Sequence, residues 1–197
     1  MGVEESWARV QADALRDFCA RAFVRLDVPE ADAWIAADAL VAADLQGIDS
    51  HGVARLRRYV QGLQHGHMRA RPNVRVVHET PTTVLIDADA GLAQPVSYRA
   101  MERAIEKAEQ VGSGFAAVRN SNHFGIAGYY AAMALSHGCI GIAMTNATAR
   151  VLPTFGQRSM LGTNPLAVAA PAGAEPPYIL DMATSAVAMG KLEINER

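Results

Sequence analysis

The sequence predicts a layered α/β protein whose first third is helical. Apolar residues recur with a helical period up to about residue 64, and short valine-rich runs alternate with amphipathic stretches from residue 73 onward. Strands that alternate with helices are typical of layered α/β folds. We therefore expect an N-terminal helical subdomain over residues 1–70 and an α/β domain over residues 71–197.

Three helices are expected in the first third. Apolar side chains at three- and four-residue steps predict a helix over residues 6–25. A second helix begins after Pro29, which suits a first turn, and ends before Gly47. A third begins at Ser50, a plausible N-cap, and continues to about Gln64.

The third helix carries the most suggestive polar pattern in the chain. If it is continuous from Ser50, then His51, Arg55 and Tyr59 fall at i, i+4 and i+8 on one face. A proton carrier, a fixed cation and a phenol on one face could hold a small carboxylate and move a proton beside it. An ordinary exposed helix face has the same pattern, and periodicity does not separate the two interpretations.

The rest of the chain alternates short strands with helices. The expected strands cover residues 73–79, 83–87, 114–119, 139–145, 166–170 and 178–181. The expected helices cover residues 94–111, 125–136 and 184–193. The first two strands are separated by Thr80-Pro81, so we expect them to pair as a hairpin.

Composition excludes several classes of partner. The net charge is −2 and no basic stripe is present, which argues against nucleic acid. No apolar run is long enough to span a membrane, and the acidic N-terminus lacks the apolar segment of a signal peptide. Cys19 and Cys139 are isolated in apolar surroundings, as small buried residues of a reducing cytosol would be. We expect a cytoplasmic protein.

One dinucleotide-binding motif can be set aside. Residues 112–117 match G-x-G-x-x-A, but the expected order is helix before the glycines and strand after them. The motif works in the opposite order, because the phosphate must meet a helix N-terminus. The glycines therefore mark a helix-to-strand turn, and any nucleotide is bound without this loop or a P-loop.

Three polar segments remain as candidate sites. Residues 119–128 leave a strand and enter a helix, so His123 and nearby backbone N–H groups could hold a phosphate or carboxylate; a polar turn with His123 as a cap is the alternative. Residues 162–165 form a turn before a strand. Residues 181–185 precede the last helix, where Asp181 or a hydroxyl could cap it or its N-terminus could take a phosphate.

The remaining histidines are interpreted as structural, and a metal site is not expected. A metal held by His51 and His123 would lack both the H-E-x-x-H spacing and a set of carboxylate ligands.

Together these motifs resemble the malate/L-lactate dehydrogenase type 2 family, which also includes ureidoglycolate, sulfolactate and diketogulonate dehydrogenases and cyclic imino acid reductases. The resemblance spans almost the whole chain in the same order and rests on residues 47–52 with Arg55 and Tyr59, residues 122–125, residues 162–166 and residues 181–185. It implies NAD- or NADP-dependent hydride transfer on a non-Rossmann α/β fold, with a small 2-hydroxy or 2-oxo acid as substrate, in a homodimer.

The resemblance also implies roles for individual residues. Ser50 and His51 would form a relay in which His51 moves the substrate proton, with His123 near the reacting centre as the other candidate acid/base. Arg55 would bind the substrate carboxylate and Thr163 would contact substrate. The cofactor would be held by His123, Phe124, Gly125, Ile126, Ala127, Asp181, Met182 and Ala183.

Other functions stay open at this point. Members of the family continue well beyond residues 181–185, so we expect a C-terminally truncated chain, and a fragment without activity is one alternative. A reductase of a cyclic imino acid is another. A metal-dependent lyase or hydrolase that uses His51 and His123 is the third.

Overall fold

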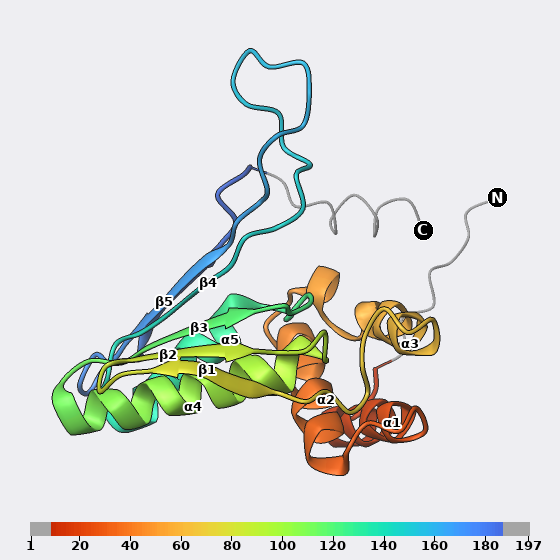
Figure 1. The fold of residues 1–197 in the computed structure, drawn as a ribbon, viewed down its shortest axis with the longest axis horizontal. Coiled ribbons are helices and arrows are strands. Elements are labelled where there is room, and N and C mark those ends of the chain that lie inside the picture. The colour runs from red at the N-terminus through yellow and green to blue at the C-terminus, as the bar shows by residue number, and fades with distance from the viewer. Residues whose placement is uncertain (1–8, 187–197) are drawn as a thin grey trace.

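The computed structural model describes residues 9–186 and begins with three helices, as expected. They are α1 (Ala12–Val24), α2 (Glu30–Leu45) and α3 (Leu56–Gln64). The first begins later than the predicted residue 6, and Trp7 lies outside the described residues. Figure 1 shows these helices gathered at one end of the molecule, beside the sheets that follow.

Helix α2 lies at the centre of this helical group. Its residues are buried around much of the helix, and most of the buried ones are alanine. Small side chains let α1, α4 (Ala93–Val111) and α5 (Ala127–Met133) pack closely on it. Asp38 on α2 accepts hydrogen bonds from Arg16 of α1 (2.7 Å) and from the hydroxyl of Tyr129 (2.7 Å), so one carboxylate ties three helices together.

The first sheet combines a hairpin with a parallel crossover. Strands β1 (Arg75–Glu79) and β2 (Thr83–Asp87) pair antiparallel, which confirms the predicted hairpin. Helix α4 (Ala93–Val111) then leads to β3 (Phe115–Arg119), which pairs parallel to β2. The sheet order is therefore β1-β2-β3.

The glycines between α4 and β3 form a turn, as predicted. Gly112 has φ +88° and ends the helix in the left-handed region, which favours glycine. Gly114 is required for a different reason: a Cβ there would lie 1.8 Å from the carbonyl oxygen of Ala104 on α4. Lys107 of α4 is buried, and its ammonium donates to the Thr80 carbonyl (2.7 Å) and pairs with Glu79 (2.9 Å).

The second sheet is antiparallel and packs on a short helix. Helix α5 (Ala127–Met133) is followed by a 3-10 turn over Ala134–His137, so the predicted continuous helix over residues 125–136 is wrong at both ends. Strands β4 (Gly141–Met144), β5 (Leu166–Ala170) and β6 (Tyr178–Met182) follow in the order β4-β5-β6. The predicted strand over residues 139–145 is shorter in the structure, where β4 alternates between buried and exposed positions.

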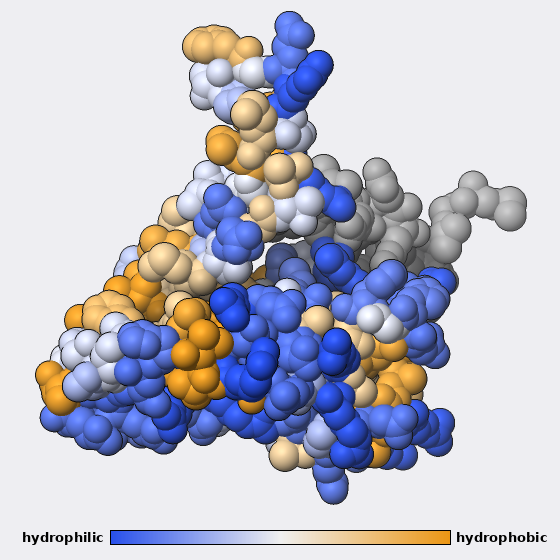
Figure 2. Space-filling model, viewed as in Figure 1, coloured by the Kyte–Doolittle hydropathy of each residue, from blue (hydrophilic) through white to orange (hydrophobic). Residues whose placement is uncertain are grey.

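An apolar groove separates the two sheets. It has a volume of about 870 Å3 and is lined by α4, β3 and β4, including Phe115, Ile140, Ile142 and Met144, all more than half exposed. Figure 2 shows hydrophobic surface along the diagonal where Figure 1 draws β4 and β5. Within the described residues β3 and β4 are both edge strands.

The two cysteines, the last expected helix and the lengths of the helices can also be compared with the predictions. Cys19 is buried, but Cys139 is only partly buried at the wall of the groove. In the predicted helix over residues 184–193, residues 184–186 are not helical and the rest lie outside the described residues. Within residues 9–186 the longest and most apolar helices fall short of what a bilayer span requires.

The close approach at Gly114 gives a stability prediction. Gly114→Ala forces a methyl group into the backbone of α4, and we expect it to lower the free energy of unfolding by about 3 kcal/mol. Gly173→Ala is the matched control, since nothing lies within 4 Å of its Cβ position and only its positive φ opposes the side chain; it should cost about 1 kcal/mol. Urea unfolding measures both, and equal losses would contradict the predicted clash.

Candidate active site

The segment between α2 and α3 is a sharp corner and not a continuous helix. Two 3-10 turns, Asp49–His51 and Val53–Arg55, precede α3 and are separated at Gly52. The predicted helix over residues 50–64 is therefore confirmed only from Leu56 onward, and the placing of His51, Arg55 and Tyr59 on one helix face is wrong.

The cause of the corner is Asp44, near the end of α2. Its carboxylate accepts a hydrogen bond from the backbone N–H of Val53 (2.9 Å), which pulls the chain back against α2. Gly52 makes this approach possible, because a Cβ there would lie 1.6 Å from the Asp44 Oδ1. Burial raises the pKa of Asp44, with a smaller contribution from Asp49, while the Val53 N–H opposes the rise.

Ser50 organises the side chains on either side of the corner. It is buried and caps no helix; its hydroxyl is 2.9 Å from Nδ1 of His51. Its carbonyl oxygen accepts a hydrogen bond from Nε of Arg55 (2.6 Å). One residue therefore sets the orientation of both the imidazole and the guanidinium.

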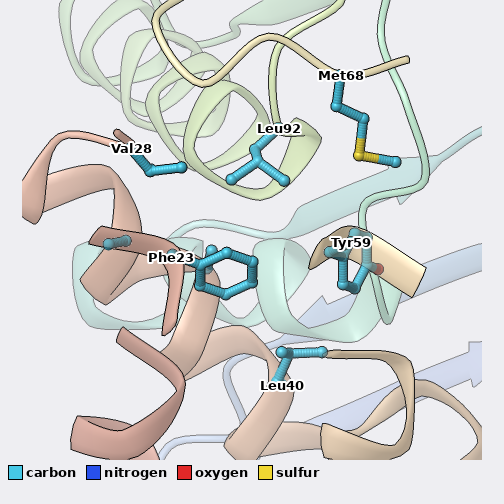
Figure 3. Close-up of a cluster of buried hydrophobic side chains, with 8 residues drawn as sticks. Phe23, Val28, Leu40, Tyr59, Met68 and Leu92 are labelled. Carbon is cyan, nitrogen blue, oxygen red and sulfur yellow. The ribbon is translucent and has the colours of Figure 1, made fainter. Parts of the chain in front are cut away.

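Tyr59 connects the helices to the β3–α5 loop. Its ring is fully buried among Phe23, Leu40, Met68 and Leu92, as Figure 3 shows. Its hydroxyl lies 2.6 Å from Nδ1 of His123. Burial raises the pKa of this phenol far above its ordinary value, so Tyr59 keeps its proton at physiological pH.

The loop that carries His123 is held on both sides. The side-chain amide of Asn122 donates to the carbonyl oxygens of Ala90 (3.0 Å) and Gly91 (2.9 Å), at the entrance to α4. Phe124 stacks on Tyr130 of α5 with ring centroids 5.0 Å apart, and the Tyr130 hydroxyl donates to the Phe124 carbonyl. Polar and aromatic contacts together fix the position of the imidazole.

His51 and His123 form a stacked pair. Their ring centroids are 5.4 Å apart and their planes differ by 22°. Burial is the main cause that lowers the pKa of His123 to about 3, and His51, Arg58 and Arg55 contribute by opposing a further positive charge. His123 is therefore neutral at physiological pH.

Asp181 occupies the start of α5. Its carboxylate accepts a hydrogen bond from the backbone N–H of Gly128 (2.6 Å), and burial raises its pKa. The sequence offered Asp181 or a hydroxyl as a possible cap of the expected helix over residues 184–193, most of which lies outside the described residues; the hydrogen bond that Asp181 accepts comes from α5, 53 positions earlier. The anion at this helix start is therefore the protein's own carboxylate.

The predicted proton-transfer residues converge, whereas the predicted substrate contact Thr163 has its hydrogen bonds elsewhere. Ser50, His51, Arg55 and His123 come together around Tyr59. Thr163 is instead linked to the end of β6: its carbonyl accepts from the N–H (2.8 Å) and the hydroxyl (3.0 Å) of Thr184. None of the hydrogen bonds described for Thr163 reaches the histidine pair.

Sequence reasoning missed Asp44 and left Tyr59 without a role. Nothing in the local pattern marks Asp44, because its partner lies nine positions away across a corner that the periodicity hides. The sequence placed Tyr59 near the site but did not identify its partner, although a buried tyrosine hydroxyl usually has a hydrogen-bond partner. Among residues 9–186 no cluster of three or more His, Cys, Asp or Glu could hold a metal ion.

Two imidazoles beside an arginine, on a mixed α/β scaffold, form a site suited to moving a proton next to a bound anion. The chain matches the malate/L-lactate dehydrogenase family model over residues 10–197 and belongs to that family. It spans about half the length of the curated relatives it matches, which are named malate and sulfolactate dehydrogenases.

Solved structures of the family show the same fold. Malate dehydrogenase from Pyrococcus horikoshii OT3 is 53% identical, with a TM-score of 0.93 over 98% of this chain and 55% of its own. Sulfolactate dehydrogenase from Methanocaldococcus jannaschii is 42% identical, with a TM-score of 0.90 over 95% and 54%. The delta1-piperideine-2-carboxylate reductase from Pseudomonas syringae is 30% identical, with a TM-score of 0.88 over 95% and 57%.

The corner gives a prediction about coupling. Gly52→Ala alone should destabilise the fold by about 1–3 kcal/mol, because its methyl displaces the Asp44 carboxylate. Asp44→Ala alone should cost about 1–2 kcal/mol through loss of the bond to Val53. In the double variant the clash is absent, so the total should fall short of the sum by about 0.5–3 kcal/mol. Additive losses in chemical unfolding would show that Gly52 and Asp44 do not interact.

Proposed function

We propose that this chain carries the substrate-binding and proton-transfer residues of an NAD- or NADP-dependent dehydrogenase that interconverts a small 2-hydroxy acid and its 2-oxo acid. The observation that carries the proposal is the convergence of the Ser50–His51 pair, Arg55 and His123 from two distant segments. Membership of the malate/L-lactate dehydrogenase family supports it.

Arg55 is proposed to bind the substrate carboxylate. Its Nε–H already donates to the Ser50 carbonyl, which fixes the plane of the guanidinium. A guanidinium fixed in this way binds a carboxylate in one orientation, and so determines which face of the 2-carbon is presented. Thr163 remains a predicted second substrate contact.

His51 is proposed to move the substrate proton. With Nδ1 directed at the Ser50 hydroxyl, its Nε2 takes the proton of the 2-hydroxyl during oxidation. The Ser50 oxygen then accepts the Nδ1–H of the imidazolium and stabilises its charge. In the reverse direction the imidazolium returns the proton to the 2-oxygen.

The residues around His123 fit a nicotinamide. Ile126 and Ala127 are buried and apolar, and nothing lies within 4 Å of the Cβ position of Gly125, so there is space beside the loop. His123 to Ala127 would line the ring, and Asp181 to Ala183 would support the loop from the end of β6, where Asp181 holds the Gly128 N–H. When bound, the nicotinamide supplies hydride acceptor and donor chemistry.

A cyclic imino acid is the second candidate substrate. The likeness to the delta1-piperideine-2-carboxylate reductase supports it. The same residues suit that reduction: Arg55 binds the ring carboxylate and His51 supplies a proton to the nitrogen. Assembly as a homodimer is a further prediction that the resemblance implies.

Turnover tests the proposed function. Residues 1–197 incubated with NADH or NADPH and a panel of 2-oxo acids, with cyclic imino acids in parallel, should lose nicotinamide absorbance with at least one substrate. Calorimetric titration of each dinucleotide should show micromolar binding. Binding without turnover would favour the incomplete fragment, and neither binding nor turnover would overturn the proposal for this chain.

Removal of the proposed proton carrier should slow catalysis while cofactor binding persists. His51→Ala is expected to lower kcat by about 10²- to 10⁴-fold, because no group replaces the imidazole as acid and base. His65→Ala is the control, since His65 is exposed at the end of α3. An unchanged kcat in His51→Ala would remove His51 from the mechanism.

Substitution of the proposed carboxylate-binding residue should act on KM. Arg55→Lys keeps the charge but loses the two-pronged geometry, so KM for the oxo acid should rise about 10- to 100-fold. The dinucleotide Kd should stay unchanged. Arg57→Lys, an exposed arginine two residues away, should alter neither constant. An unaltered KM in Arg55→Lys would place the substrate carboxylate elsewhere.

A further inference from the structure

Two donors converge on one nitrogen of His123. The Tyr59 hydroxyl is 2.6 Å from Nδ1, and the backbone N–H of Gly125 points at the same atom from 3.4 Å. A backbone amide can only donate, so Nδ1 must accept and cannot carry a proton. In a neutral imidazole the proton then resides on Nε2.

The Tyr59 hydroxyl agrees with this assignment. If Nδ1 is an acceptor, the phenol must be the donor, and a fully buried phenol with a raised pKa retains the proton it donates. The Gln94 carboxamide lies close enough to influence the phenol, but neither of its polar atoms makes a hydrogen bond of normal geometry. The bond to His123 is therefore the one that fixes the Tyr59 hydroxyl.

The charges around His123 also favour its neutral form. His51 faces it across the stacked pair, Arg55 and Arg58 lie on the corner and α3, and Tyr59 is uncharged. Each cation opposes protonation of His123. Protonation of His123 is therefore disfavoured, whereas His51 has the Ser50 hydroxyl beside its Nδ1.

We infer that Tyr59 is a positioning residue that, with the Gly125 N–H, holds His123 as the neutral Nε2–H tautomer. His123 then serves as a fixed hydrogen-bond donor to the substrate 2-oxygen, and proton transfer is left to His51. This division of labour rests on the proposed function; the tautomer itself does not.

The tautomer is tested without any turnover. Nitrogen-15 NMR of the labelled chain should show His123 with a bare Nδ1 and a protonated Nε2, and with no change between about pH 5 and pH 8. A protonated Nδ1, or a titration of His123 in that range, would overturn the inference. Because no substrate is present, failure here is distinct from failure of the proposed function.

Removal of the phenol hydroxyl should release the ring. In Tyr59→Phe the neutral form loses a donor, so the His123 pKa should move up by about one unit and the second tautomer should become populated. Tyr129→Phe is the control: it removes a partly buried tyrosine hydroxyl that bonds Asp38 and not His123, and it should leave the His123 signals in place. Identical His123 spectra in Tyr59→Phe and the native chain would contradict the role of Tyr59.

Conservative substitution of His123 separates a donor from an acid/base. Glutamine places an N–H near the position of Nε2 but does not titrate, so His123→Gln should retain at least tenfold more kcat than His123→Ala. The pH profile of the glutamine variant should keep the limb that belongs to His51. An equal loss of kcat in both variants would make His123 the acid/base and refute the inference.

Discussion

The hydrogen bond between Tyr59 and His123 is the constraint on which the site depends. It joins residues 64 positions apart, one from the helical third of the chain and one from the loop after β3. The phenol is buried in the core of the helices, so the bond cannot shift without disturbing that core. The relative placement of the two imidazoles follows from how the helices pack, because Ser50 on the corner sets one ring and Tyr59 sets the other.

Much of the fold was predictable because it depends on local chemistry. Proline and glycine marked the ends of α2, valine-rich runs marked the hairpin, and the glycines after α4 marked a turn. The corner before α3 was not predictable, because it depends on Asp44 reaching a backbone N–H across the fold. Its sequence has helical spacing, and tertiary contact overrides that spacing. The division at residue 70 remains a prediction.

The site was predictable in its residue types but not in its connections. The motifs led to Ser50, His51, Arg55 and His123, and these do converge. At the start of α5, where the sequence suggested that a phosphate or carboxylate could bind, the carboxylate of Asp181 accepts a hydrogen bond from the Gly128 N–H. The sequence of α5 alone could not predict this hydrogen bond, because the carboxylate comes from β6. The hydrogen bond from the Gly128 N–H to Asp181 therefore links the start of α5 to β6, next to the loop that carries His123.

The unpaired edges of β3 and β4 have a consequence for how this polypeptide behaves at high concentration. Each edge presents backbone donors and acceptors beside an apolar groove, within the residues that the structure describes. Backbone pairing does not depend on side-chain identity, so such edges recruit extended segments of any sequence. Proteins commonly protect edges with charge, yet Phe115, Ile142 and Met144 are apolar and exposed here. The apolar groove and the two edges beside it therefore favour association of this polypeptide at high concentration.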